Sequence, residues 1–214
     1  ITATNDSPTN DSTNDYGNYC TLNALQSSSR GGTLSEGNLK FSSAGLQDFD
    51  FGTLTIPTSG KWYWEILMGA HNVNYSFLGI KSKEEANASA SADGTGVYGM
   101  YQSNNSGTNG HRVENNATTL PGGGASQAVT WSPADRINIA YNADDQKLWF
   151  GKNGTFYNFN SGATLTVDSS TAQFGTIISQ EYLPFVGGNN SSYGSGETTY
   201  TFNFGATAFT DTPP

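Results

Sequence analysis

Hydrophobic and polar positions alternate along several short stretches of this chain, and the clearest stretch lies near its middle. Within residues 136–142 the apolar side chains occupy every second position, and polar side chains take most of the others. A polar turn at 143–146 follows, then the apolar run Leu148-Trp149-Phe150, then Asn153-Gly154. Alternation at period two is typical of half-buried strands, and Asn-Gly is a strong hairpin signal. The pattern predicts an antiparallel meander with one face exposed to water.

The same period recurs on both sides of this meander. Residues 61–68 place four large apolar side chains on one face and two on the other, which predicts a central strand covered on both sides. Residues 199–204 alternate most cleanly, and residues 76–80, 97–101, 174–179 and 182–187 predict further strands. The segment 102–132 is rich in Asn and Gly, and a strand at 111–114 or 128–131 could lie within it.

About a dozen short strands with no convincing helix predict an all-β protein, an antiparallel two-sheet β-sandwich. Charged residues make up only 13% of the 214 residues, yet 13% are aromatic, which favours an ordered core over disorder. Residues 1–15 carry a repeated Thr-Asn-Asp-Ser motif and almost no apolar side chain. We therefore expect two parts: an extended low-complexity N-terminal arm at 1–15 and one sandwich domain at 16–214.

The charge of the chain excludes some partners. Its formal net charge is −9 and it has no basic run, so we expect neither nucleic acid nor an anionic membrane surface as a partner. The apolar stretches are too short for membrane insertion. Cys20 is the single cysteine, so no intrachain disulfide can form, and we interpret it as a small buried side chain. The chain begins at Ile1 without a signal-peptide pattern, which suggests a processed product or a piece of a longer chain.

Few residues suggest catalysis, and we predict no catalytic residue, no metal site and no cofactor. His71 and His111 lie in loop-like sequence, without a motif that pairs either of them with Cys20. The pair Asp48/Asp50 alternates with phenylalanines, so we expect it to face solvent. The pair Asp144/Asp145 falls in a predicted hairpin turn, where turn chemistry explains Asp before glycoside cleavage or calcium binding does.

Seven short motifs follow one another in a specific order: Ser59-Gly60-Lys61-Trp62-Tyr63-Trp64-Glu65, Gly79-Ile80, Val97-Tyr98-Gly99, Asp135-Arg136-Ile137, Leu148-Trp149-Phe150-Gly151-Lys152-Asn153-Gly154, Leu183-Pro184-Phe185-Val186 and Phe202-Asn203-Phe204-Gly205. This set resembles a SPRY domain over about residues 37–212. The resemblance implies a concanavalin A-like jelly roll without a catalytic role. The segments 19–25, 34–39 and 209–214 are similar to the branch of that family found in structural proteins of tailed phages and marine viruses.

Two groups of residues are candidates for partner binding. The resemblance implies that a partner docks on loops at one end of the sandwich, which correspond here to Asp93, Gly94, Thr95, Val186, Asn189 and Asn190. Aromatic and polar residues among the Asn- and Gly-rich loops form the second group, namely Tyr101, His111, Arg112 and Tyr193. Aromatic faces and amides suit the recognition of polar polymers, and the alternative is that these side chains only fill the surface.

Together these observations favour a non-enzymatic structural or interaction module of a virion, such as a phage capsid decoration, fibre or tail protein. Its expected partners are other virion proteins or copies of itself, and its expected location is the extracellular particle. The alternative is a lectin-like or receptor-binding module, secreted or on a cell surface, that recognises a glycan or a host surface through the end loops. A secreted carbohydrate-active enzyme is a third hypothesis.

Overall fold

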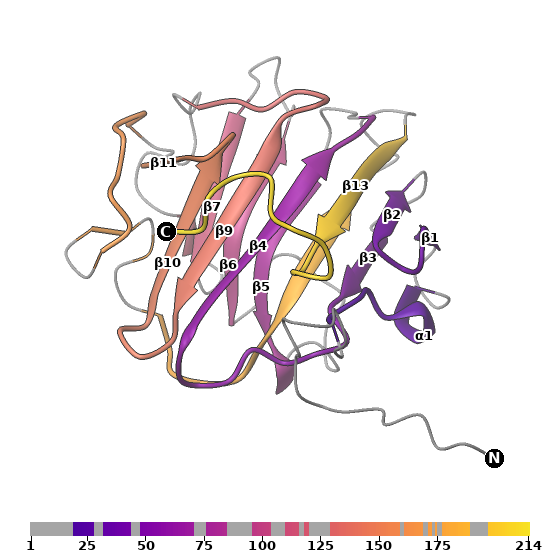
Figure 1. Cartoon of the computed structure of the whole chain (residues 1–214), viewed down its shortest axis with the longest axis horizontal. Helices are drawn as coiled ribbons and strands as arrows, with labels where there is room; N and C mark the ends of the chain where they lie inside the picture. The colour runs from indigo at the N-terminus through magenta and orange to yellow at the C-terminus, as the bar shows by residue number, and fades with distance from the viewer. Residues whose placement is uncertain are drawn as a thin grey trace.

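The computed structural model describes residues 19–27, 32–43, 48–70, 76–84, 96–103, 110–115, 118–119, 129–158, 161–168, 171–172, 174, 177–188 and 197–214. In this part of the chain, strands form two sheets, every strand pair is antiparallel, and one helical turn, α1 (Ala24–Ser27), lies at the edge (Figure 1). The predicted all-β sandwich is confirmed. The predicted arm at 1–15 lies outside the described residues.

The first sheet has seven strands and is the layer nearer the viewer in Figure 1. Its order is β1 (Thr33–Ser35), β2 (Lys40–Ser43), β13 (Thr198–Asn203), β4 (Lys61–Met68), β9 (Arg136–Asn142), β10 (Lys147–Lys152) and β11 (Thr155–Tyr157). The predicted central strand, β4, pairs with β13 on one side and with β9 on the other. The strand from the end of the chain therefore lies beside strands from its first third.

The second sheet has six strands and lies behind the first. Its order is β3 (Asp48–Phe51), β12 (Tyr182–Gly188), β5 (Ser76–Ser82), β6 (Val97–Ser103), β7 (Gly110–Asn115) and β8 (Thr118–Thr119). Strand β7 is the one that the sequence placed within the long Asn- and Gly-rich segment. Residues 129–131, by contrast, belong to no strand.

The space between the sheets is filled mainly by the apolar side chains that alternate along the central strands. Strand β4 contributes Trp64, Ile66 and Met68 to this core, and residues of β5 and β9 with the same inward parity pack against them. Three tyrosines from both sheets meet edge to face, with 5.8 Å between the ring centroids of Tyr98 and Tyr182 and 6.0 Å between those of Tyr141 and Tyr182. Edge-to-face packing sets the positive ring edge against the negative ring face, so these contacts hold the layers together beyond simple burial.

The meander β9–β10–β11 follows the predicted pattern, and its second turn shows why. Asn153 and Gly154 both have positive φ, 51° and 81°, as a type I′ hairpin turn requires. The expectation of one water-exposed face is wrong, because Asn138 and Trp149 on the outer parity are buried as well. Segments distant in sequence cover them, and period two cannot reveal such a cover.

The prediction that Asp48 and Asp50 face solvent is also wrong. Both carboxylates are buried and lie on the inner parity of β3, where Ser43 Oγ of the other sheet donates to Asp48 Oδ2 at 2.9 Å. The alternating phenylalanines Phe49 and Phe51 instead join a second apolar cluster with Phe185, separate from the central core. Alternation shows which residues share a face, but it does not show which face is the interior.

Cys20 is half buried rather than fully buried, and burial raises the pKa of its thiol. Among the described residues, no helix has both the length and the apolar character that a membrane span needs.

Candidate binding site

The chain turns back across the outer face of the seven-stranded sheet after β13. In Figure 1 this last segment, in yellow, crosses in front of β4 and β9 and ends over β10. Asn203 shapes the turn, because its side chain donates to the carbonyls of Thr207 and Ala208 and accepts from the N–H of Gly205. We call residues 204–214 the C-terminal strap.

Glu65 of β4 anchors the strap to the sheet. Its carboxylate is buried and accepts the backbone N–H of Thr210 at 3.1 Å and that of Asp211 at 2.8 Å. The Tyr63 hydroxyl donates to the same carboxylate at 3.0 Å, and Arg136 Nε lies 3.7 Å from it. A buried carboxylate needs such partners, so this side chain fixes where the strap crosses the sheet.

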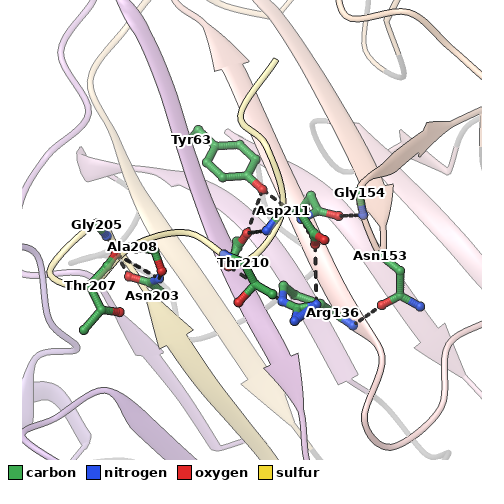
Figure 2. A network of polar contacts seen from close by, with 12 residues as sticks. Tyr63, Arg136, Asn153, Gly154, Asn203, Gly205, Thr207, Ala208, Thr210 and Asp211 are labelled. Carbon is green, nitrogen blue, oxygen red and sulfur yellow. Dashed lines mark hydrogen bonds and ion pairs between the residues drawn. The ribbon is translucent and has the colours of Figure 1, made fainter.

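Asp211 extends the same network toward β9 and the β10–β11 turn, as Figure 2 shows. Its Oδ2 accepts from Asn138 Nδ2 at 2.9 Å and lies 3.6 Å from an Arg136 guanidinium nitrogen. The side-chain oxygen of Asn138, Oδ1, in turn accepts the N–H of Gly154 at 2.9 Å. Burial, followed by the nearby charge of Glu65, raises the pKa of Tyr63, so its hydroxyl stays protonated. The network therefore positions the strap.

Beside this network, a row of three outward side chains forms the floor of a pocket. The strand register sets Ala140 of β9 between Tyr63 of β4 and Trp149 of β10. Because a methyl group stands between two large rings, the surface is hollowed there. The pocket has a volume of about 460 Å³, which lies within the range of small-molecule sites.

The walls of the pocket come from segments outside the sheet. Val167 and Asp168 of the segment after β11 form one wall, and Pro213 and Pro214 of the strap form another. Trp149 holds the first wall in place, because its indole N–H donates to the carbonyl of Thr171. The pocket therefore depends on the docking onto the sheet of the strap and of the segment that holds Val167 and Asp168.

One end of the pocket is polar. Lys61, Asn142 and Asp145 line it, and Lys61 and Asp145 are exposed. The Asn142 amide donates to Asp145 Oδ2 at 2.9 Å, which holds that carboxylate at the rim. Within the described residues, the Lys61 ammonium makes no ion pair. This end therefore offers both a hydrogen-bond donor and hydrogen-bond acceptors to a ligand.

The residues that the sequence singled out for binding do not lie at this pocket where the structure describes them. Val186 is fully buried in β12 as part of the core. Tyr101 of β6 pairs with Arg112 of β7, and His111 pairs with Gln102, so the register brings these three together on neighbouring strands. The remaining predicted residues are outside the described part of the chain, namely Asp93, Gly94, Thr95, Asn189, Asn190 and Tyr193. Their binding roles stay predictions.

One residue of the sequence indicates the covered outer face beside the pocket. Glu65 stands in a strand predicted to be covered on both sides, and a carboxylate in such a place needs a partner.

Asp144 and Asp145 are exposed in the β9–β10 turn, as predicted, and Asp144 Oδ1 accepts the N–H of Gly60 at 3.1 Å. No group of three or more His, Cys, Asp or Glu side chains suited to a metal ion occurs in the part of the chain that the structure describes.

No family model matches this chain, and no curated protein matches its sequence. Its structure is similar to the SPRY domain of human HERC1, at 14% identity and a TM-score of 0.54, over 87% of this chain and 99% of that one. A second human SPRY domain aligns at 11% identity and a TM-score of 0.52, over 83% of this chain and 97% of that one. Stonustoxin aligns at 13% identity and a TM-score of 0.55, over 86% of this chain and 28% of its own. These likenesses confirm the SPRY-type fold.

Proposed function

We propose that this protein is a non-enzymatic binding module and that it serves as a structural component of a virion. The observation that carries the binding role is the pocket floored by Ala140, whose walls come from separate segments fixed to a rigid sheet. Ligand sites are typically concave and pre-formed, with a few placed polar groups. This pocket is concave, its lining mixes apolar and polar side chains, and its walls are held to the sheet by hydrogen bonds.

The use of the acidic groups beside the pocket also supports binding over reaction. Glu65 and Asp211 are the carboxylates that converge under the strap, and both are engaged by backbone N–H groups, Asn138 or Arg136. Carboxylates held in this way stabilise a surface. A reacting pair, in contrast, needs access to a substrate bond and a separation suited to it.

The virion setting rests on the sequence resemblance of the opening and closing segments to phage and marine viral proteins. In this setting the sandwich is a scaffold that contacts neighbouring virion proteins or further copies of the chain. The scarcity of charged side chains agrees with a surface that contacts other proteins, because charged residues are depleted at the centre of protein interfaces.

A lysine-reactive crosslinker applied to purified particles tests this proposal. Lys61 lines the pocket, whereas Lys83 follows β5 of the other sheet and is paired with Glu181 at 2.6 Å, so it serves as the internal control. We expect the chain in the particles at a fixed stoichiometry, with Lys61 crosslinked to an identified virion protein or a second copy. Absence of the chain from purified particles would overturn the virion role. Crosslinks from Lys83 alone would overturn the role of the pocket in those contacts.

A further inference from the structure

We propose that the pocket floored by Ala140 binds one pyranose ring of a neutral glycan. This inference rests on the proposed binding function and names the ligand class for it. A pyranose has an apolar C–H face and a rim of hydroxyl groups, and the pocket has an apolar floor with one polar end.

The floor suits the apolar face of such a ring. Ala140 leaves room for the ring between Tyr63 and Trp149 in the register of β4, β9 and β10. Trp149 itself is buried, so the partly exposed Tyr63 supplies the aromatic surface that a sugar can touch. Aromatic rings carry negative charge on their faces, which attracts the slightly positive C–H hydrogens of a sugar. The Tyr63 ring is itself held edge to face by Phe209 of the strap, at 4.7 Å between centroids. The floor is therefore set in place before a ligand arrives, which lowers the entropic cost of binding.

The polar end suits the hydroxyl groups. A sugar hydroxyl donates one hydrogen bond and accepts others, so it is best served by donors and acceptors together. Lys61 supplies a donor, and the Asp145 carboxylate keeps one oxygen without a hydrogen bond among the described residues, because Asn142 binds the other. Asp168 adds a second exposed carboxylate on the opposite wall.

The charge at the pocket selects a neutral ring over an anion. Two carboxylates, those of Asp145 and Asp168, line the pocket with one ammonium, that of Lys61, in a chain of net charge −9. A sialic acid, a sulfated sugar or a phosphate would meet net repulsion there.

The sheet geometry disfavours an extended peptide at the same place. Strand β9 pairs with β4 on one side and with β10 on the other, so the backbone groups under the pocket are already bonded within the sheet. Peptide recognition by strand addition needs a free edge, and none lies beneath this pocket in the part of the chain described. Recognition must come from side chains, which suits a small ring rich in hydroxyls.

The test is a titration of the full chain with methyl glycosides of glucose, galactose, mannose and N-acetylglucosamine, followed by ¹H–¹⁵N correlation spectra. We expect at least one glycoside to shift the Trp149 indole signal, with a Kd of about 1 mM for a ligand of this size. Ala140→Leu fills the floor and should raise Kd about tenfold or more. The matched control is Ala163→Leu, at an exposed alanine that does not line the pocket, and it should leave Kd within about twofold.

A second variant guards against misfolding of the first. Lys61→Ala changes an exposed side chain and should weaken binding about tenfold by removing the donor. The inference is overturned if no glycoside binds, if binding survives both pocket variants, or if a proline-rich peptide shifts the Trp149 signal while the sugars do not. If no sugar binds but Lys61 still crosslinks to virion proteins on particles, the sugar ligand is overturned and the virion role stands. If a sugar binds but the chain is absent from purified particles, the virion role is overturned and the sugar ligand stands.

Discussion

Asp50 makes the stability of the sandwich depend on pH, because its carboxyl group is buried on the face of β3 that points between the two sheets. One oxygen accepts the N–H groups of Phe51 at 2.7 Å and of Asn23 at 3.2 Å, whereas the other is buried without a hydrogen-bond partner among the described residues. Burial raises the pKa of Asp50 to about 7, and the two hydrogen bonds oppose this only in part. In the unfolded chain the same group titrates near about 3.9.

The sign of the effect follows from the proton balance. Between about pH 4 and about pH 7 the folded state holds a proton on Asp50 that the unfolded state has released. The free energy of unfolding therefore falls as pH rises through this window, and above pH 7 this group contributes no further change. At about 1.4 kcal/mol per pKa unit, a rise of about three units amounts to at most about 4 kcal/mol.

Asp50→Asn should remove this dependence. An amide keeps an oxygen for the two backbone donors and does not titrate, but its NH₂ group is buried without an acceptor, at a pH-independent cost of about 1–3 kcal/mol. The variant should be less stable than the parent chain at about pH 4.5. Relative to the parent it should gain about 3 kcal/mol by about pH 7.5.

Urea denaturation followed by tryptophan fluorescence at several pH values measures the effect. The difference between variant and parent isolates Asp50, because every other titrating group is common to both. Asp144→Asn makes the same charge change at an exposed turn residue and serves as the matched control. A variant that keeps the parental pH profile would refute the reasoning.

Three further predictions concern the strap and the β10–β11 turn. Glu65→Ala removes the acceptor of two backbone N–H groups and one of the acidic partners of Arg136. It should lower the free energy of unfolding by about 2–4 kcal/mol and expose the strap to limited proteolysis, measured by mass spectrometry. A strap that stays uncleaved would count against this prediction. Gly154→Ala strains a residue at φ 81° and should lower the unfolding free energy by about 1–2 kcal/mol in urea, and an unchanged midpoint would be the contrary result. Tyr63→Phe deletes the hydroxyl shared by Glu65 and Asn138. It should lower the free energy of unfolding by about 1–2 kcal/mol, seen as a lower thermal midpoint, and should preserve sugar binding. Loss of that binding would place the hydroxyl in the ligand site.

The sequence predicted the strands better than it predicted their surroundings. Alternation in 136–142, 61–68 and 199–204 identified β9, β4 and β13, and Asn153-Gly154 identified a hairpin turn, because these signals are local to a few residues. The side of β3 that faces inward was predicted wrongly, because that choice depends on the second cluster around Phe185. The pocket was missed because its parts lie as far apart as Lys61 and Pro214.

The amino-acid sequence by itself determined that this protein is an antiparallel β-sandwich with an aromatic core. Side-chain period and turn residues are properties of neighbouring positions, and they are present in the chain before it folds. Only the tertiary structure decided that the outer face of the seven-stranded sheet is covered by a strap and hollowed beside it. A hollow forms where a small residue such as Ala140 lies between large rings from other strands, and strand register sets those neighbours across the sheet.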